Sequence, residues 1–88
     1  MNIHFQSIIN AMLENYTFKR ENLYASPGIN NQVIKVCMNH HHADLLVGIG
    51  NLIGAAKAVG DYESMDEIKQ IFHEILVHKV PTPLTTGA

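Results

Sequence analysis

The chain has 88 residues, the size of one domain, and its composition is globular, with 47% hydrophobic and 16% charged residues. Its formal net charge is −2, and Lys19 and Arg20 form the only adjacent pair among its six Lys and Arg residues. Nucleic-acid binding depends on clustered positive charge, so the sequence argues against a nucleic-acid partner. The charged fraction lies below the usual quarter, which indicates that part of the surface is covered.

A single cysteine, Cys37, excludes an internal disulfide. Small secreted domains usually carry several disulfides, so we expect a cytoplasmic protein. The first residues lack the basic and apolar regions of a signal peptide. The most apolar window, 43–59, contains Asp44 and Lys57 and is shorter than the roughly 20 apolar residues of a membrane span. We therefore expect no membrane association.

Residues 2–16 are predicted to form the first helix, with Asn2 as its cap. Apolar side chains recur there at helical spacing. These side chains are Phe5, Ile8, Ile9, Met12 and Tyr16.

Residues 17–30 are predicted to form an irregular loop, because Ser26, Pro27 and Gly28 favour a turn. The loop carries Phe18 and Tyr24. In a polar connection such side chains either pin the loop to the core or provide the contact surface for a partner. We assign Phe18 and Tyr24 to a predicted interface.

Residues 31–59 keep a helical period throughout and predict a long central helix, which Gly60 ends. Residues 32–38 are rich in β-branched side chains. The alternative is therefore an α+β fold with a short hairpin around 22–38, in which residues 23–24 pair with 32–38.

Residues 64–79 are predicted to form the third helix. Ser64 and Glu67 have the spacing of a capping box, and Pro81 ends the helix. Residues 81–88 are predicted to be a flexible C-terminal tail, which leaves 1–80 as a single helical domain.

These lengths predict an all-α, three-helix arrangement in which the short helices each cover about half of the long one. Such an object is thin and has a large exposed side, since so short a chain buries only about 60–65% of its unfolded surface. Self-association as a homodimer or higher homo-oligomer would cover this side.

Small residues recur on one side of the central helix at Gly50, Gly54 and Ala58. Glycine inside a helix costs about 1 kcal/mol relative to alanine, so this ridge predicts a close helix–helix contact. The contact lies either with the third helix or with another subunit. The alternative is that the glycines only bend the helix.

A second cluster comprises Cys37, His40, His41 and Asp44, which are ligand types that zinc accepts. All four stand on one helix, whereas structural zinc sites usually draw ligands from two elements. The alternatives are ordinary helical histidines or a pH-dependent contact. We expect the third helix to stay away from residues 40–42.

No nucleophile–base motif and no phosphate-binding loop is evident, so we expect a protein without enzymatic activity. The sequence favours a protein-binding protein of the inhibitor, adaptor or chaperone type, which acts through a helical face and the 17–30 loop. The alternatives are a metal- or pH-responsive sensor that uses Cys37 and His40–His42, and a small-molecule binder with a cavity between oligomer helices. No cofactor is expected, apart from the possible zinc.

Overall fold

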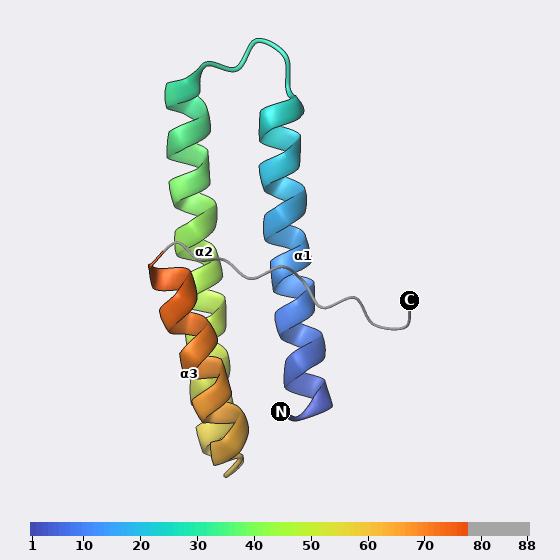
Figure 1. The fold of residues 1–88 in the computed structure, drawn as a ribbon, viewed down its shortest axis with the longest axis vertical. Coiled ribbons are helices and arrows are strands. Elements are labelled where there is room, and N and C mark those ends of the chain that lie inside the picture. Colours follow the sequence, from blue (N-terminus) through green and yellow to red (C-terminus); the bar gives the residue numbers. More distant parts are fainter. Residues whose placement is uncertain (78–88) are drawn as a thin grey trace.

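The computed structural model describes residues 1–77, which form three α-helices (Figure 1). Helix α1 spans Ile3–Ala25, α2 spans Asn31–Ala58 and α3 spans Tyr62–Leu76. The all-α class with a long central helix is confirmed. Residues 1–77 contain no strand, and the alternative hairpin around 22–38 is wrong because this stretch forms the end of α1 and the start of α2. Helix α3 ends at Leu76, earlier than the predicted end at 79, and residues 78–79 and the predicted tail 81–88 lie outside the described residues.

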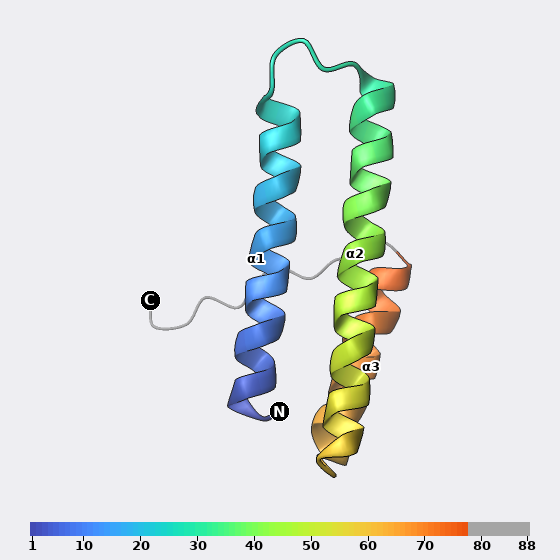
Figure 2. The same ribbon diagram turned by 180° about the vertical axis from the view of Figure 1, so that it is seen from behind.

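The three helices are arranged around α2, which packs against both α1 and α3. Helices α1 and α2 lie side by side and antiparallel, joined by a loop at one end of the molecule. Helix α3 then runs back along only the C-terminal half of α2 (Figures 1 and 2). The molecule is therefore elongated and flat, with Cα extents of 48 × 29 × 17 Å.

The core lies where all three helices meet. Ile49, near the middle of this region, is fully buried, as are Ile68 and Ile75 of α3. Each helix contributes side chains at helical spacing. In α1 the burial follows the predicted stripe only in part, since Ile9 and Tyr16 are buried but Ile8 is exposed and Leu13 is buried in addition. The buried core residues are Ile9, Leu13, Tyr16, Leu45, Ile49, Leu52, Ala56, Ile68 and Ile75.

Helix α1 continues nine residues beyond its predicted end at Tyr16. Residues 17–25 lose the clear apolar period, yet they contain no glycine or proline, and Lys19, Arg20 and Leu23 are good helix formers. The helix ends only at Ser26, whose ψ of 120° is extended. Proline disfavours the helical conformation in the residue before it, so Pro27 sets this end.

A tight turn joins α2 to α3. Gly60 has a φ of +74°, and its N–H donates to the Lys57 carbonyl while the Asp61 N–H donates to the Ala56 carbonyl. This is the glycine-dependent motif that commonly ends helices. Asp61 then caps α3, since its Oδ1 accepts a hydrogen bond from the Ser64 N–H at 3.1 Å. The prediction that Ser64 is the cap is wrong, because the turn places Asp61 at the cap three residues earlier.

Ser64 instead joins the start of α3 to the start of α1. Its side chain is 1% exposed, and its Oγ accepts a hydrogen bond from the Asn2 N–H at 2.9 Å. The Met1 amino group lies 3.3 Å from Oε2 of Glu67 in the same region. Hydrogen bonding by the Ser64 side chain, followed by its backbone N–H, holds the pKa of the Asp61 carboxyl below its ordinary value.

Ser64→Ala is expected to lower the free energy of unfolding by about 0.5–1.5 kcal/mol, because it removes the partly buried hydrogen bond between the Asn2 N–H and the Ser64 hydroxyl. Urea unfolding followed by circular dichroism measures the change. Ser7→Ala, at an exposed serine of α1, is the control and should stay within about 0.5 kcal/mol of the parent. Equal stability of the two variants would contradict a structural role for the Ser64 hydroxyl.

None of the helices within residues 1–77 has both the length and the apolar character that crossing a membrane requires.

Candidate protein-binding surfaces

Among residues 1–77, no third helix packs on the loop-side half of the α1–α2 pair. Helix α3 ends at Leu76, beside His42, whereas α1 continues to Ala25 and α2 begins at Asn31 (Figure 1). We call residues 17–41 the arm. Helix pairs in this layout leave apolar side chains exposed unless another element covers them.

Both predicted interface aromatics belong to the arm, where they lie on α1 and not in a loop. Phe18 is 63% exposed and Tyr24 is 67% exposed. Six residues separate them, so at about 100° per residue they stand about 120° apart around the helix. Eleven residues separate Tyr24 from the buried Leu13, which places Tyr24 on nearly the same side of α1 as the core. Phe18 points to another side.

The three residues of the predicted ridge, Gly50, Gly54 and Ala58, have different surroundings in the structure. A Cβ on Gly50 would lie 3.7 Å from Cε2 of Phe72, so this glycine faces α3 at ordinary contact distance. A Cβ on Gly54 would meet no atom within 4 Å, and Ala58 is exposed. Two of the three ridge residues therefore have no packing role among the described residues.

The close helix–helix approach occurs instead at Gly48, which the sequence did not single out. A Cβ there would lie 3.1 Å from Sδ and 3.3 Å from Cε of Met12. Gly48 lies three residues after the buried Leu45 and seven after His41, so it is on the side of α2 that faces α1. This position on the apolar stripe is the sequence feature from which the contact could have been predicted.

The side chains of His40, His41 and His42 point in three different directions, because consecutive residues on a helix do not share a face. His40 is exposed, and its Nε2 lies 3.5 Å from Oδ2 of Asp44 one turn on. His41 is half-buried toward α1, and its buried Nδ1 has no hydrogen-bond partner among residues 1–77. Cys37 is a half-buried free thiol.

No set of three His, Cys, Asp or Glu side chains within residues 1–77 is placed to hold a metal ion. Of the four predicted ligands, only His40 and Asp44 form a pair. The zinc site stays a prediction without support from this geometry.

His42 reaches α3, contrary to our expectation that the third helix stays away from residues 40–42. Its Nε2 lies 2.6 Å from the Ile75 carbonyl oxygen, in the last turn of α3. The final carbonyls of a helix lack partners within the helix, and a ring N–H satisfies one of them. The expectation failed because α3 runs fully antiparallel to α2, so its end returns to the level of His42.

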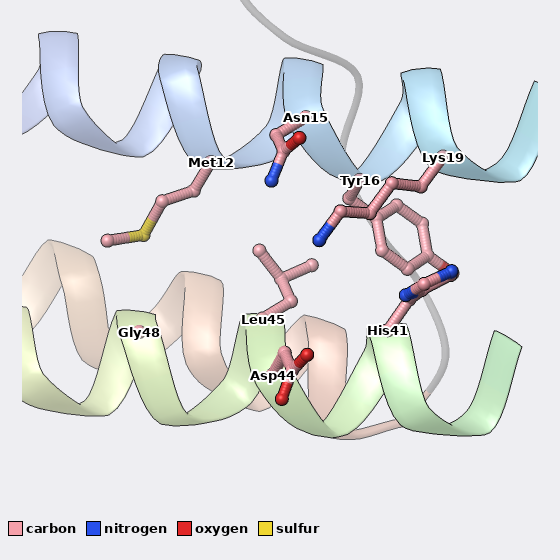
Figure 3. Close-up of a pocket in the computed structure, with 8 residues that line it drawn as sticks. All are labelled: Met12, Asn15, Tyr16, Lys19, His41, Asp44, Leu45 and Gly48. Carbon is pink, nitrogen blue, oxygen red and sulfur yellow. The ribbon is translucent and has the colours of Figure 1, made fainter. Parts of the chain in front are cut away.

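A cleft of about 210 Å³ lies on the seam between α1 and α2. The Lys19 ammonium and the Asn15 amide point into it from α1, and the His41 ring points into it from α2 (Figure 3). This volume is below the roughly 300–1,000 Å³ of a drug-sized ligand site. The lining residues are Met12, Asn15, Tyr16, Lys19, His41, Asp44, Leu45 and Gly48.

Comparison of the chain with family models, curated proteins and solved structures gives no match. What the chain does must therefore be inferred from its surfaces.

Proposed function

We propose that this chain is a non-enzymatic, protein-binding protein of the cytoplasm, of the inhibitor, adaptor or chaperone type, and that it works as a homo-oligomer. Its arm is the recognition surface. A helix of the partner lies there along α2, in the position that α3 occupies further down. The unpaired thiol of Cys37 supports a reducing compartment.

The observation that supports this proposal is that no third helix from residues 1–77 covers the arm. In the lower half of the molecule, α3 completes a core with Ile49 and Ile75 fully buried. In the arm, Met38 is only partly buried and Tyr24 is mostly exposed. An amphipathic partner helix that covers them would extend the existing core, as in helix-in-groove recognition.

Tyr24→Ala is expected to weaken partner binding at least tenfold, because exposed aromatics that become buried dominate interface energetics. The wild-type chain is immobilised to capture proteins from the native host, and retained proteins are identified by mass spectrometry. The affinity of each candidate for wild type and variant is then measured by titration. Phe18→Ala tests the second predicted anchor on its separate face.

Ile3→Ala is the matched control, since Ile3 is 75% exposed on the same helix but outside the arm. A true partner is retained by wild type and by Ile3→Ala and is lost with Tyr24→Ala. If every retained protein binds all variants equally, the arm is not the recognition surface.

The other hypotheses have less support. The sensor hypothesis lacks an assembled ligand set among residues 1–77. The small-molecule hypothesis has the cleft between α1 and α2, whose volume of about 210 Å³ is below the range of drug-sized ligand sites.

A further inference from the structure

A second surface of the molecule runs along the full length of α2, on a different side of this helix from the side that the partner helix of the proposed function covers. Its residues Val33, Val36 and His40 belong to the arm. We call this surface the back face of α2; seen from behind, α2 lies in front of α3 (Figure 2). Its residues recur at spacings of three and four and share one side of the helix. All eight are exposed, and none is Lys, Arg, Asp or Glu: Val33, Val36, His40, Ala43, Val47, Asn51, Gly54 and Ala58.

Packing within the chain does not account for this face. Helix α1 contacts α2 on the side of Gly48, and α3 contacts it at His42 and at Gly50. Gly50 lies one turn before Gly54, so α3 borders one edge of the back face, yet Val36 and Val47 remain 68% and 64% exposed. Apolar patches this long on a small protein usually mark an interaction site.

When two copies of the back face run in opposite directions, each valine of one copy meets a smaller residue of the other. We propose that a second copy of the chain packs here, with the two α2 helices antiparallel and a two-fold axis between positions 45 and 46. Residues whose numbers add up to 90 or 91 then meet. The layers are Val33 with Ala58, Val36 with Gly54, His40 with Asn51, and Ala43 with Val47, each pair formed between the two copies.

Each of three layers joins a valine to a smaller residue, which allows the helices to interdigitate closely. The two polar residues of the face, His40 and Asn51, fall in the same layer and can hydrogen-bond to each other. A parallel pair would instead set Val36 against Val36, Gly54 against Gly54 and His40 against His40. It would leave a gap at the glycines, so the antiparallel arrangement fits better. Antiparallel helix dipoles also attract each other.

A hollow of about 290 Å³ lies at the N-terminal end of the back face, lined by Asn30, Gln32, Val33, Val36 and Cys37. The two-fold axis brings the C-terminal end of the other α2 to this hollow. Ala58 of that end then lies against Val33, one of the residues that line the hollow.

This inference rests on the proposed homo-oligomer and specifies the surface through which it forms. Analytical ultracentrifugation should show a dimer for the wild-type chain. Gly54→Leu should raise the dimer dissociation constant more than tenfold, because Gly54 faces Val36 of the second copy. Circular dichroism should still show a folded chain, since a Cβ at Gly54 meets nothing within the monomer.

Ala11→Leu is the matched control. Ala11 is also an exposed small residue inside a helix, but it lies on α1 and not on the back face of α2. The control should dimerise like the parent. A monomeric wild type, or a dimer that tolerates Gly54→Leu as well as Ala11→Leu, would overturn the proposal.

Disulfide crosslinking tests the direction of the two helices. With Cys37→Ser as background, Val36→Cys and Gly54→Cys are prepared as separate chains. Mixed under oxidising conditions, they should form a heterodimeric disulfide, while neither should crosslink alone, because position 36 of one copy lies about 27 Å along the axis from position 36 of the other. Crosslinking of either variant alone would overturn the antiparallel arrangement.

These outcomes are distinguishable from failure of the proposed function. Tyr24→Ala should leave the dimer intact, because Tyr24 is on α1. A chain that dimerises through α2 but retains no Tyr24-dependent partner would disprove the recognition role and leave the dimer interface standing.

Discussion

Ile49→Ala is expected to lower the free energy of unfolding by about 2–5 kcal/mol. Ile49 is fully buried in α2 at the level where all three helices meet, so truncation leaves a cavity bordered by rigid helices. A domain of this size has a total stability on the order of 5–10 kcal/mol. The melting temperature should therefore fall by about 10 °C or more, as measured by circular dichroism at fixed protein concentration.

Ile3→Ala provides the same chemical change at a residue that is 75% exposed. Its effect should stay within about 0.5–1 kcal/mol, because little apolar surface is lost. Similar losses for the two variants would mean that the core does not lie where the three helices converge.

Gly48→Leu is expected to lower the free energy of unfolding by about 1–3 kcal/mol, the usual effect of overpacking. A Cβ alone would already come within 3.1 Å of Met12 Sδ, and the larger leucine must displace the Met12 side chain or α1 itself. Thermal and urea unfolding both measure the loss.

Met12→Ala in the Gly48→Leu background should recover part of this loss, because it removes the atoms in conflict. Ala55→Leu, at an exposed position of the same helix, should be close to neutral. If Met12→Ala adds its own full loss to that of Gly48→Leu, then the two positions do not share the contact that the structure shows.

The three helices and the cap of the first could be predicted from the sequence, because these features depend on local patterns. Asn2 accepts a hydrogen bond from the His4 N–H, as expected of a cap. The start of α2 and its end near Gly60 were predicted within about one residue for the same reason.

The features that were not predicted depend on how the helices pack against one another. The extension of α1 to Ala25 was missed because residues 17–25 are helical without a buried face, so they lack the apolar period. Ser64 satisfies a capping pattern equally well as a cap or as an interior residue, and only its contact with Asn2 shows which role it has. The roles of Gly48 and His42 depend on which side of α2 each neighbour occupies.

The connectivity around α2 also bears on how the molecule folds. Each helix packs mainly against its neighbour in the sequence, across short turns at 26–30 and 59–61. Domains rich in such local contacts fold in microseconds to milliseconds, because little loop entropy opposes their formation. The hydrogen bond between Asn2 and Ser64 spans 62 positions. It is therefore expected to form only after both hairpins are in place.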